Sequence, residues 1–239
     1  MRGPNAVRGH RVLKVCGATT RDDVELLAKA GADLVGVWHG VPGGHANLAS
    51  EELAGLATAA RATRRIQPVL VTFTSDVDAL CDIVERTGIR WVQLHAYQMP
   101  AMVRALRVAL RGELTIVKVL HVRAGTCLER PLIRAYERAG TDLFLFDNVA
   151  QDGRIGSTGQ QLRGSDVLDL LPALSRPFLL AGGISAGNRA EYEAVVRHPQ
   201  FFGIDVDTAA RDDRGCLESA NVSDIARGWR TACYSREVA

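Results

Sequence analysis

The sequence predicts an α/β protein, a (β/α)₈ TIM barrel made of a single domain. Short apolar runs alternate with segments whose apolar residues recur at helical spacing, and this alternation repeats eight times within 239 residues. With 47% hydrophobic residues, a chain of this length can bury one large core, and no linker or low-complexity tract divides it. A doubly wound open sheet is the alternative with the same alternation. We expect the domain to span residues 1–239, with residues 1–10 as a flexible N-terminal extension.

The predicted strands are apolar runs bounded by turn residues, and the predicted helices lie between them. The strands are expected at residues 12–16, 34–38, 68–73, 91–95, 115–120, 143–147, 177–181 and 202–206. The helices are expected at residues 22–30, 50–63, 76–87, 100–110, 129–139, 165–171, 188–197 and 219–232. Serine hydroxyls can accept the first backbone N–H groups of a helix, which predicts N-caps at Ser50, Ser75 and Ser165. Left-handed residues commonly end helices, which predicts this role for Gly31, Gly88 and Gly140.

Charge and cysteine patterns exclude several classes of function. The formal net charge is +2 and the basic residues are scattered, so neither a nucleic-acid footprint nor a polybasic membrane patch is present. No apolar stretch approaches the roughly 20 residues that span a bilayer, and no apolar signal core follows the N-terminus. The five cysteines are widely spaced without a C-x-x-C pair, which argues against a disulfide framework or a zinc site. We expect a cytoplasmic protein with reduced thiols, monomeric or homodimeric, with no nucleic-acid or membrane partner.

Two polar residues close apolar strands that lie far apart in the sequence. Cys16 ends the run at residues 12–16, and Asp147 ends the run at residues 143–147. In a barrel of alternating strands and helices, the carboxyl ends of all strands meet at one face. A thiol and a carboxyl group from distant strands can therefore act together on one small substrate. The pair predicts proton transfer on a small molecule.

Glycine-rich stretches follow the sixth and seventh predicted strands. They lie at residues 156–159 and 181–183. Residues without a Cβ atom let successive backbone N–H groups approach an anion, and many barrels hold a phosphate near their last two strands. Tight strand-to-helix turns need glycine as well, so each stretch taken singly leaves both interpretations open.

Seven short motifs along the chain carry a family resemblance. They are LKVCG (13–17), AGAD (30–33), VQLH (92–95), LFD (145–147), GSTG (156–159), LAGGI (180–184) and GIDV (203–206). In this order they resemble the phosphoribosylanthranilate isomerase family over almost the whole chain. The resemblance implies a (β/α)₈ barrel of the tryptophan pathway that converts an N-glycosidic aminoaldose to an aminoketose, an Amadori rearrangement, without metal or organic cofactor. It also implies Cys16 as the general base and Asp147 as the general acid.

The chemistry suits a thiol and a carboxyl group. An acid protonates the furanose oxygen to open the ring, and a base then takes the proton from sugar C2. A carboxyl group can act as that acid only where desolvation keeps it protonated near pH 7. A free thiol has a pKa near 8.5, so we expect that a modest downward shift of the Cys16 pKa, for example by Lys14, makes it a base.

Three positions depart from the family pattern. Asn47 stands where the family has an arginine for the anthranilate carboxylate, and Asp207 stands where phosphate-binding serines are usual. Gln160 replaces a lysine. Losing a guanidinium removes a bidentate carboxylate partner, and a carboxylate repels a phosphate. We expect an aminosugar or N-glycoside substrate that lacks the anthranilate or the phosphate, in specialised metabolism, while the ordinary pathway substrate stays an alternative.

Nine further residues are expected to bind the substrate. They are His39, Asn47, Gln93, His95, Gly159, Gly182, Gly183, Asp205 and Asp207. No metal or cofactor is expected.

Three other functions stay open. A metal-dependent sugar epimerase would use three histidines at strand ends, with Asp147 and Asp205; they are His39, His95 and His121. An aldolase-like barrel would use a lysine, and Lys14 and Lys118 are expected to face the barrel interior. A noncatalytic barrel that binds a ligand is the last alternative.

Overall fold

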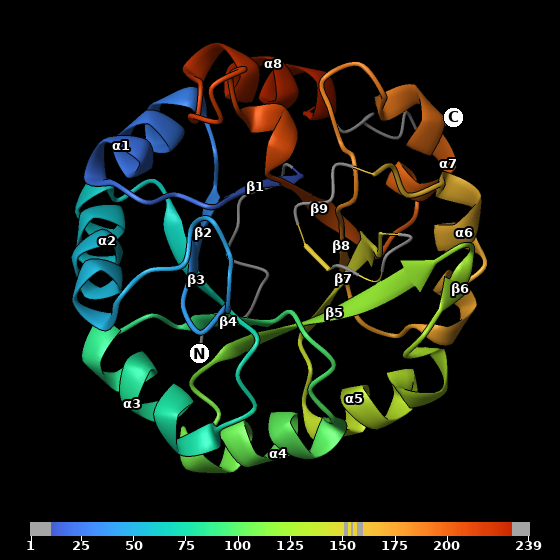
Figure 1. The fold of residues 1–239 in the computed structure, drawn as a ribbon. Coiled ribbons are helices and arrows are strands. Elements are labelled where there is room, and N and C mark those ends of the chain that lie inside the picture. Colours follow the sequence, from blue (N-terminus) through green and yellow to red (C-terminus); the bar gives the residue numbers. More distant parts are fainter. Residues whose placement is uncertain (1–10, 151–152, 154, 157–159, 231–239) are drawn as a thin grey trace, which may run out of the picture.

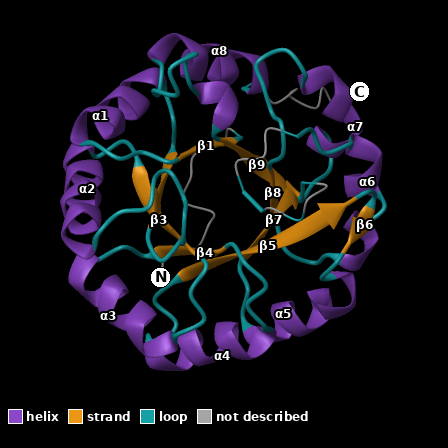
Figure 2. Ribbon diagram, in the orientation of Figure 1, coloured by secondary structure: helices purple, strands orange, loops and turns teal. Residues whose placement is uncertain are grey.

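A computed structural model describes residues 11–150, 153, 155–156 and 160–230. Its sheet has nine strands, and all except β6 run parallel and close into a barrel that the helices surround (Figures 1 and 2). The strand order is β4-β3-β2-β1-β9-β8-β7-β5, and β4 pairs with β5 to close the ring. This closure confirms the (β/α)₈ barrel and excludes the open sheet.

The elements follow the predicted alternation. The strands are β1 (Val12–Cys16), β2 (Leu34–Trp38), β3 (Gln67–Thr72), β4 (Trp91–Leu94), β5 (Thr115–Arg123), β6 (Thr126–Cys127), β7 (Leu143–Asn148), β8 (Phe178–Leu180) and β9 (Phe201–Val206). The α-helices are α1 (Arg21–Ala30), α2 (Ser50–Thr63), α3 (Val77–Thr87), α4 (Pro100–Ala109), α5 (Ile133–Ala139), α6 (Gly164–Leu168), α7 (Glu193–Val196) and α8 (Ser219–Trp229). Short 3₁₀ turns lie at Arg130–Leu132, Leu171–Ala173, Arg189–Tyr192 and Thr208–Ala210. None of the helices in the described part of the chain has the length and apolar character needed to cross a membrane.

An antiparallel hairpin at β5 and β6 was not predicted. The strand β5 extends to Arg123, where the sequence analysis ended it at Leu120, because Val122 and Arg123 pair with Cys127 and Thr126 of β6. The turn between them uses Ala124 and Gly125, both with positive φ angles. The hairpin extends beyond the barrel beside α6 (Figure 1).

The helix ends were predicted in part. Gly31, Gly88 and Gly140 end α1, α3 and α5 with φ angles of 99°, 64° and 109°, as expected. The serine caps were wrong, because the N-cap residues of α2, α3 and α6 are Ala49, Asp76 and Arg163. The α5 helix is also shorter than predicted, because a 3₁₀ turn takes up residues 130–132.

Two apolar layers fix which residues reach the barrel mouth. One layer fills the space between strands and helices, and the other fills the barrel interior with Val12, Leu34, Val69, Trp91, Val117, Val119, Leu143, Leu145, Leu179 and Ala181. Lys14 lies two residues from interior Val12, on the same face of β1, and is therefore inside the barrel, as expected. Lys118 was expected inside, but it lies two residues from Leu120 of the outer layer, on the same face of β5. Its Nζ lies 5.4 Å from the ring centroid of Tyr136 on α5. The prediction for Lys118 was therefore wrong.

Candidate active site

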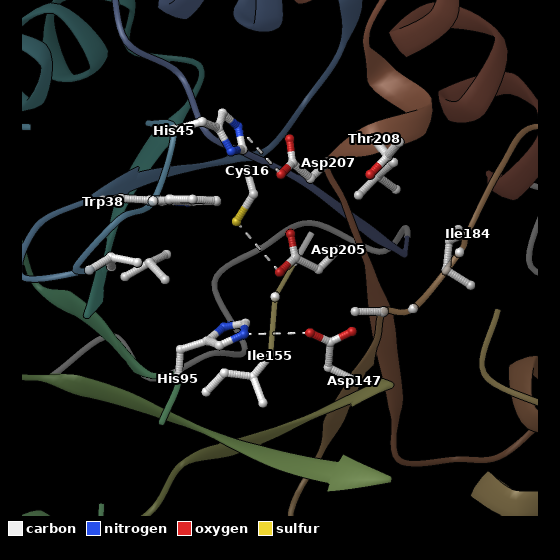
Figure 3. A pocket seen from close by; sticks show the side chains of 18 of the residues that line it. Cys16, Trp38, His45, His95, Asp147, Ile155, Ile184, Asp205, Asp207 and Thr208 are labelled. Carbon is white, nitrogen blue, oxygen red and sulfur yellow. Dashed lines mark hydrogen bonds and ion pairs between the residues drawn. The ribbon is translucent and has the colours of Figure 1, made fainter. Parts of the chain in front are cut away.

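A cavity of about 770 Å³ opens at the carboxyl ends of the barrel strands. Cys16 at the end of β1, Asp147 on β7 and Asp205 on β9 all line it, together with His95, which follows β4. Figure 3 shows Asp205 between Cys16 and Asp147. Residues about 130 positions apart in the sequence meet here because parallel strands end at one face. The volume suits a sugar with an aryl group.

Cys16 belongs to a buried cluster with Lys14 and Asp205. Lys14 Nζ donates to Cys16 Sγ and to Asp205 Oδ2, each at 2.7 Å. The Cys16 thiol lies 3.7 Å from the same carboxylate oxygen. All three side chains are under 8% exposed, and β1 and β9 hold them together because Lys14 and Asp205 are register partners. Asp205 is thus the carboxylate partner of the buried lysine.

Burial changes the acidity of this cluster. Burial raises the pKa of Cys16 to about 12, the Asp205 carboxylate adds to the rise, and Lys14 opposes it. Burial also raises the pKa of Asp205 against the lowering effect of Lys14. The expected modest downward shift of the Cys16 pKa was wrong, because a lysine shared with a carboxylate cannot offset the loss of water. In the free site Cys16 is a thiol.

Asp147 contacts His95 across the cavity. Its Oδ2 lies 3.5 Å from His95 Nε2, and its Oδ1 accepts the backbone N–H of Asn148 at 2.9 Å. The His95 ring stacks on Phe73, with centroids 5.5 Å apart. Its Nδ1 lies 2.8 Å from Nε2 of Gln93, which is fully buried below the cavity. Gln93 thus orients the histidine and does not line the cavity.

Gly182 and Gly183 line the side of the cavity next to β8. Their φ angles are 80° and 65°, which favour glycine. A Cβ on Gly183 would lie 2.6 Å from Gln161 Cα, so the backbone packs too closely for any side chain. Their exposed backbone suits an anionic group. Gly159, the other glycine expected at this site, lies outside the described residues.

Asp207 is bound to a cation that sequence reasoning missed. Arg211 Nε donates to Asp207 Oδ1 at 2.7 Å, and the guanidinium also donates to the backbone oxygen of Gly17 at 3.0 Å. His45 Nε2 lies 3.9 Å from Asp207 Oδ2 at the cavity mouth (Figure 3). Asp207 lines the cavity, but Arg211 balances its charge. The four-residue spacing of Asp207 and Arg211 in the sequence was the signal that could have predicted this ion pair.

The loop between β2 and α2 forms one wall of the cavity. Val41 and His45 of the loop line it, beside Trp38 at the end of β2, and Val71 and Phe73 pack on the same side. Two predicted contact residues hold this loop without lining the cavity. They are Asn47, whose Oδ1 accepts the backbone N–H of Val41 at 2.8 Å, and His39, whose Nδ1 lies 2.8 Å from Leu48 O.

The ionisable side chains that line the cavity are mostly acidic. Within the described residues they are Asp147, Asp205 and Asp207 with the histidines His45 and His95 and the Cys16 thiol, and no lysine or arginine side chain is among them. No group of three or more metal-ligating side chains is found in that same part of the chain. The histidines of the metal alternative face different partners, with His121 bound to Glu129.

A family model described as N-(5'-phosphoribosyl)anthranilate (PRA) isomerase matches residues 13–227. The chain belongs to the phosphoribosylanthranilate isomerase family. The resemblance carried by the seven motifs is thereby confirmed, and with it the class of aldose–ketose isomerases.

Several members of the family are similar over their full length. N-(5'-phosphoribosyl)anthranilate isomerase of Rhodopseudomonas palustris is 30% identical over 227 residues, which cover 92% of this chain and 99% of the relative. N-(5'-phosphoribosyl)anthranilate isomerase 2 of Methanosarcina mazei is 29% identical over 216 residues, 88% of this chain and 90% of the relative. The phosphoribosyl anthranilate isomerase structure from Thermus thermophilus has a TM-score of 0.74 at 20% identity, covering 91% of this chain and 97% of that chain.

Proposed function

We propose that this protein catalyses an Amadori rearrangement of an N-glycosidic aminoaldose, with Cys16 as general base and Asp147 as general acid. The observation that carries the proposal is that these two groups line one cavity, with the buried carboxylate of Asp205 between them. The protonated carboxyl of Asp147 gives its proton to the furanose oxygen. The bond from that oxygen to C1 breaks, and the nitrogen lone pair forms an iminium.

The base forms after the ring has opened. The iminium carries a positive charge beside the sulfur, and an opposite charge favours the thiolate over the thiol. Asp205, 3.7 Å from Cys16 Sγ, can accept the thiol proton, while Lys14 stays within 2.7 Å of both atoms and balances the negative charge on either. This explains how a thiol whose pKa burial raises to about 12 serves as a base.

The remaining steps return every proton. The Cys16 thiolate takes the proton from C2, and the electron pair moves into the C1–C2 bond to give an enolamine. Cys16 then returns this proton to C1, while the C2 hydroxyl proton passes to Asp147 as the ketone forms. Asp205 returns the thiol proton, so all three groups end as they began.

We further propose that the substrate carries less negative charge than phosphoribosylanthranilate. That compound has a carboxylate and a phosphate, and the ionisable groups of the described cavity lining are three aspartates, two histidines and the Cys16 thiol. The aglycone wall of Trp38, Val71 and Phe73 suits an uncharged aryl amine. Backbone at Gly182 and Gly183 can receive either a hydroxyl or a phosphate.

A panel of four substrates tests this proposal. It comprises phosphoribosylanthranilate, its phenyl analogue without the carboxylate, and the dephosphorylated form of each. We expect kcat/KM to be highest for a carboxylate-free compound by roughly tenfold, which corresponds to about 1.4 kcal/mol. Highest kcat/KM with phosphoribosylanthranilate would instead assign the tryptophan-pathway reaction. Binding without turnover of any compound would favour the noncatalytic alternative, and chelator-sensitive turnover restored by metal would favour the epimerase alternative.

A further inference from the structure

A second buried group of ionisable side chains lies beside the acid end of the cavity, and the proposed mechanism does not use it. His121 on β5 is fully buried, and Glu129, which follows β6, is 4% exposed. His121 Nδ1 lies 2.6 Å from Glu129 Oε1, and the backbone N–H of His121 donates to Oε2 at 2.9 Å. One carboxylate therefore holds both the ring and the backbone of the same residue.

This geometry fixes the tautomer of the imidazole. A carboxylate only accepts hydrogen bonds, so Nδ1 of His121 must carry a proton. Burial lowers the pKa of His121, which makes the ring neutral and leaves Nε2 unprotonated. That nitrogen is buried and has no hydrogen-bond partner within the described residues. Lys118 Nζ, 3.7 Å from Glu129 Oε1, supplies the positive charge that balances the carboxylate.

The β5–β6 hairpin is the device that brings Glu129 to His121. The two residues are eight positions apart, and the reversal of the chain returns the carboxylate to the strand it left. The backbone N–H of Leu128 donates to His121 O at 3.0 Å, which extends the ladder to the residue before Glu129. The hairpin thus places the Glu129 carboxylate on His121 near the mouth of the barrel.

His121 adjoins the acid of the site. It is the register partner of Asp147 on β7. It lies two residues from Val119 of the interior layer, on the same face of β5, so its side chain faces inward. Its ring also meets the ring of His95 edge-on, with centroids 6.0 Å apart and planes at 74°. His95 is thereby held between Phe73 and His121, with its Nε2 3.5 Å from Asp147 Oδ2.

We propose that His121 and Glu129 form a positioning pair for the acid half of the site, acting on Asp147 through His95. The inference rests on the proposed function, in which Asp147 must hold a proton before ring opening. Glu129 keeps Nε2 of His121 an acceptor and not a donor, in a ring that contacts His95 edge-on. An exchanged tautomer would change that contact, and with it the surroundings of the Asp147 carboxyl group beside His95 Nε2.

The pair lies among charged and titratable groups from several elements. Those that act on His121 are Lys118 on β5, His95 and Tyr97 after β4, and Glu129; Asp147 is its register partner on β7, and Asp205 on β9 interacts with Asp147. Glu129 is the charged group on Nδ1, at 2.6 Å, and Lys118 Nζ lies 3.7 Å from the same carboxylate oxygen. A change at Glu129 therefore addresses the tautomer directly.

The substitution Glu129→Gln separates positioning from packing. The His121 backbone N–H cannot change its role, so in this variant it keeps the new side-chain amide oxygen as its acceptor, and the amide NH₂ group faces Nδ1. The ring must then move its proton to Nε2. We expect ¹⁵N NMR to show this exchange of tautomers, and kcat/KM to fall by up to about 10²-fold. The alkaline limb of its pH profile should shift, because the His121 ring contacts His95, whose Nε2 lies 3.5 Å from Asp147 Oδ2.

Controls keep the result specific. Glu129→Asp retains a carboxylate and should restore the native tautomer in part, and Leu128→Ala, on the exposed part of the same hairpin, should leave both readouts unchanged. The rate at which iodoacetamide labels Cys16, followed by mass spectrometry, should be unaffected because the base half lies on β1 and β9.

Two outcomes overturn the inference. One is an unprotonated Nδ1 on His121 in the unmodified protein, which needs no variant and is decisive even if Glu129→Gln does not fold. The other is an exchanged tautomer in Glu129→Gln with an unchanged ¹³C titration of the Asp147 carboxyl group. Neither NMR readout requires turnover, so failure of the positioning pair is distinguished from failure of the proposed reaction.

Discussion

Cys16 and Asp147 end their strands in unequal surroundings. Cys16 has a lysine at 2.7 Å and a carboxylate at 3.7 Å, and burial raises its thiol pKa to about 12. Asp147 has the imidazole ring of His95 and one backbone N–H. In the proposed mechanism the thiol therefore needs a charge that the reaction itself supplies, whereas the carboxyl group acts first. The proposed order of the two proton transfers rests on these contacts.

Asp207 sets the charge at the rim of the cavity. Replacing it by serine removes a carboxylate and leaves the Arg211 guanidinium, still held by Gly17 O, without that counter-charge. We expect Asp207→Ser to bind phosphorylated ligands more tightly, measured by calorimetry with ribose 5-phosphate derivatives and their dephosphorylated counterparts. Asp213→Ser removes an exposed charge from the same segment and should change neither affinity. If the unmodified protein prefers the phosphorylated form and Asp207→Ser changes nothing, the proposed loss of phosphate recognition is wrong.

The loop from β2 to α2 supports the part of the cavity wall that Trp38 forms at the end of β2. Trp38 pairs with Asn47 as an isolated bridge, and the Asn47 side chain holds the Val41 backbone N–H. His39 fastens the loop again at Leu48. These contacts explain why Asn47, which was expected to bind the substrate, instead holds the loop in this wall of the cavity.

Removing the Asn47 amide should loosen this wall. In Asn47→Ala the buried Val41 N–H loses its acceptor, which costs about 1–3 kcal/mol locally. We expect KM to rise severalfold with kcat nearly unchanged, because Asn47 itself does not line the cavity and has no proton-transfer group. Steady-state kinetics on the preferred substrate measures both constants. Asn47→Asp keeps the acceptor oxygen and should behave like the native protein; a KM increase of equal size there would refute the loop-holding role.

The predictability of each element follows from the range of the interactions that form it. The strand at residues 12–16 was predicted with its observed ends, because an apolar run bounded by a glycine is a local signal. The β5–β6 hairpin was missed because two residues of β6 carry too little pattern. The cavity residues Cys16 and Asp147 could be predicted from strand ends, whereas Arg211 beside Asp207 depends on a turn that the 3₁₀ segment at residues 208–210 creates.

At the scale of the whole molecule, the barrel holds buried charged side chains near the carboxyl ends of its strands, next to an apolar interior layer. The buried pair of Lys14 and Asp205 joins the first strand to the last across the closure of the sheet. Truncating one partner of such a pair is costly, typically about 3–5 kcal/mol, because the other charge is left buried. The same residues thus serve the proposed chemistry and the closure of the barrel.

The buried thiol links the stability of the barrel to pH. The pKa of Cys16 is about 12 in the folded chain against an ordinary 9.0, so its stabilising contribution is complete below pH 9 and is lost as pH rises toward 12. We expect the unfolding free energy of the native protein to fall more steeply than that of Cys16→Ser from pH 9 upward, in urea titrations at each pH. Lys118, whose pKa burial lowers to about 8, changes stability in the opposite sense, but it is present in both proteins and cancels in the difference. Parallel pH dependences would contradict the raised thiol pKa.

The acid–base assignment is tested most directly by turnover of Cys16→Ser and Asp147→Asn on the best substrate of the four-compound panel. Each substitution keeps the shape of the side chain and removes its proton-transfer group, so the account predicts a loss of about 10² or more in kcat for each variant. Circular dichroism should show an intact barrel in both. Near-native turnover in both variants would contradict the assignment of Cys16 and Asp147 as base and acid.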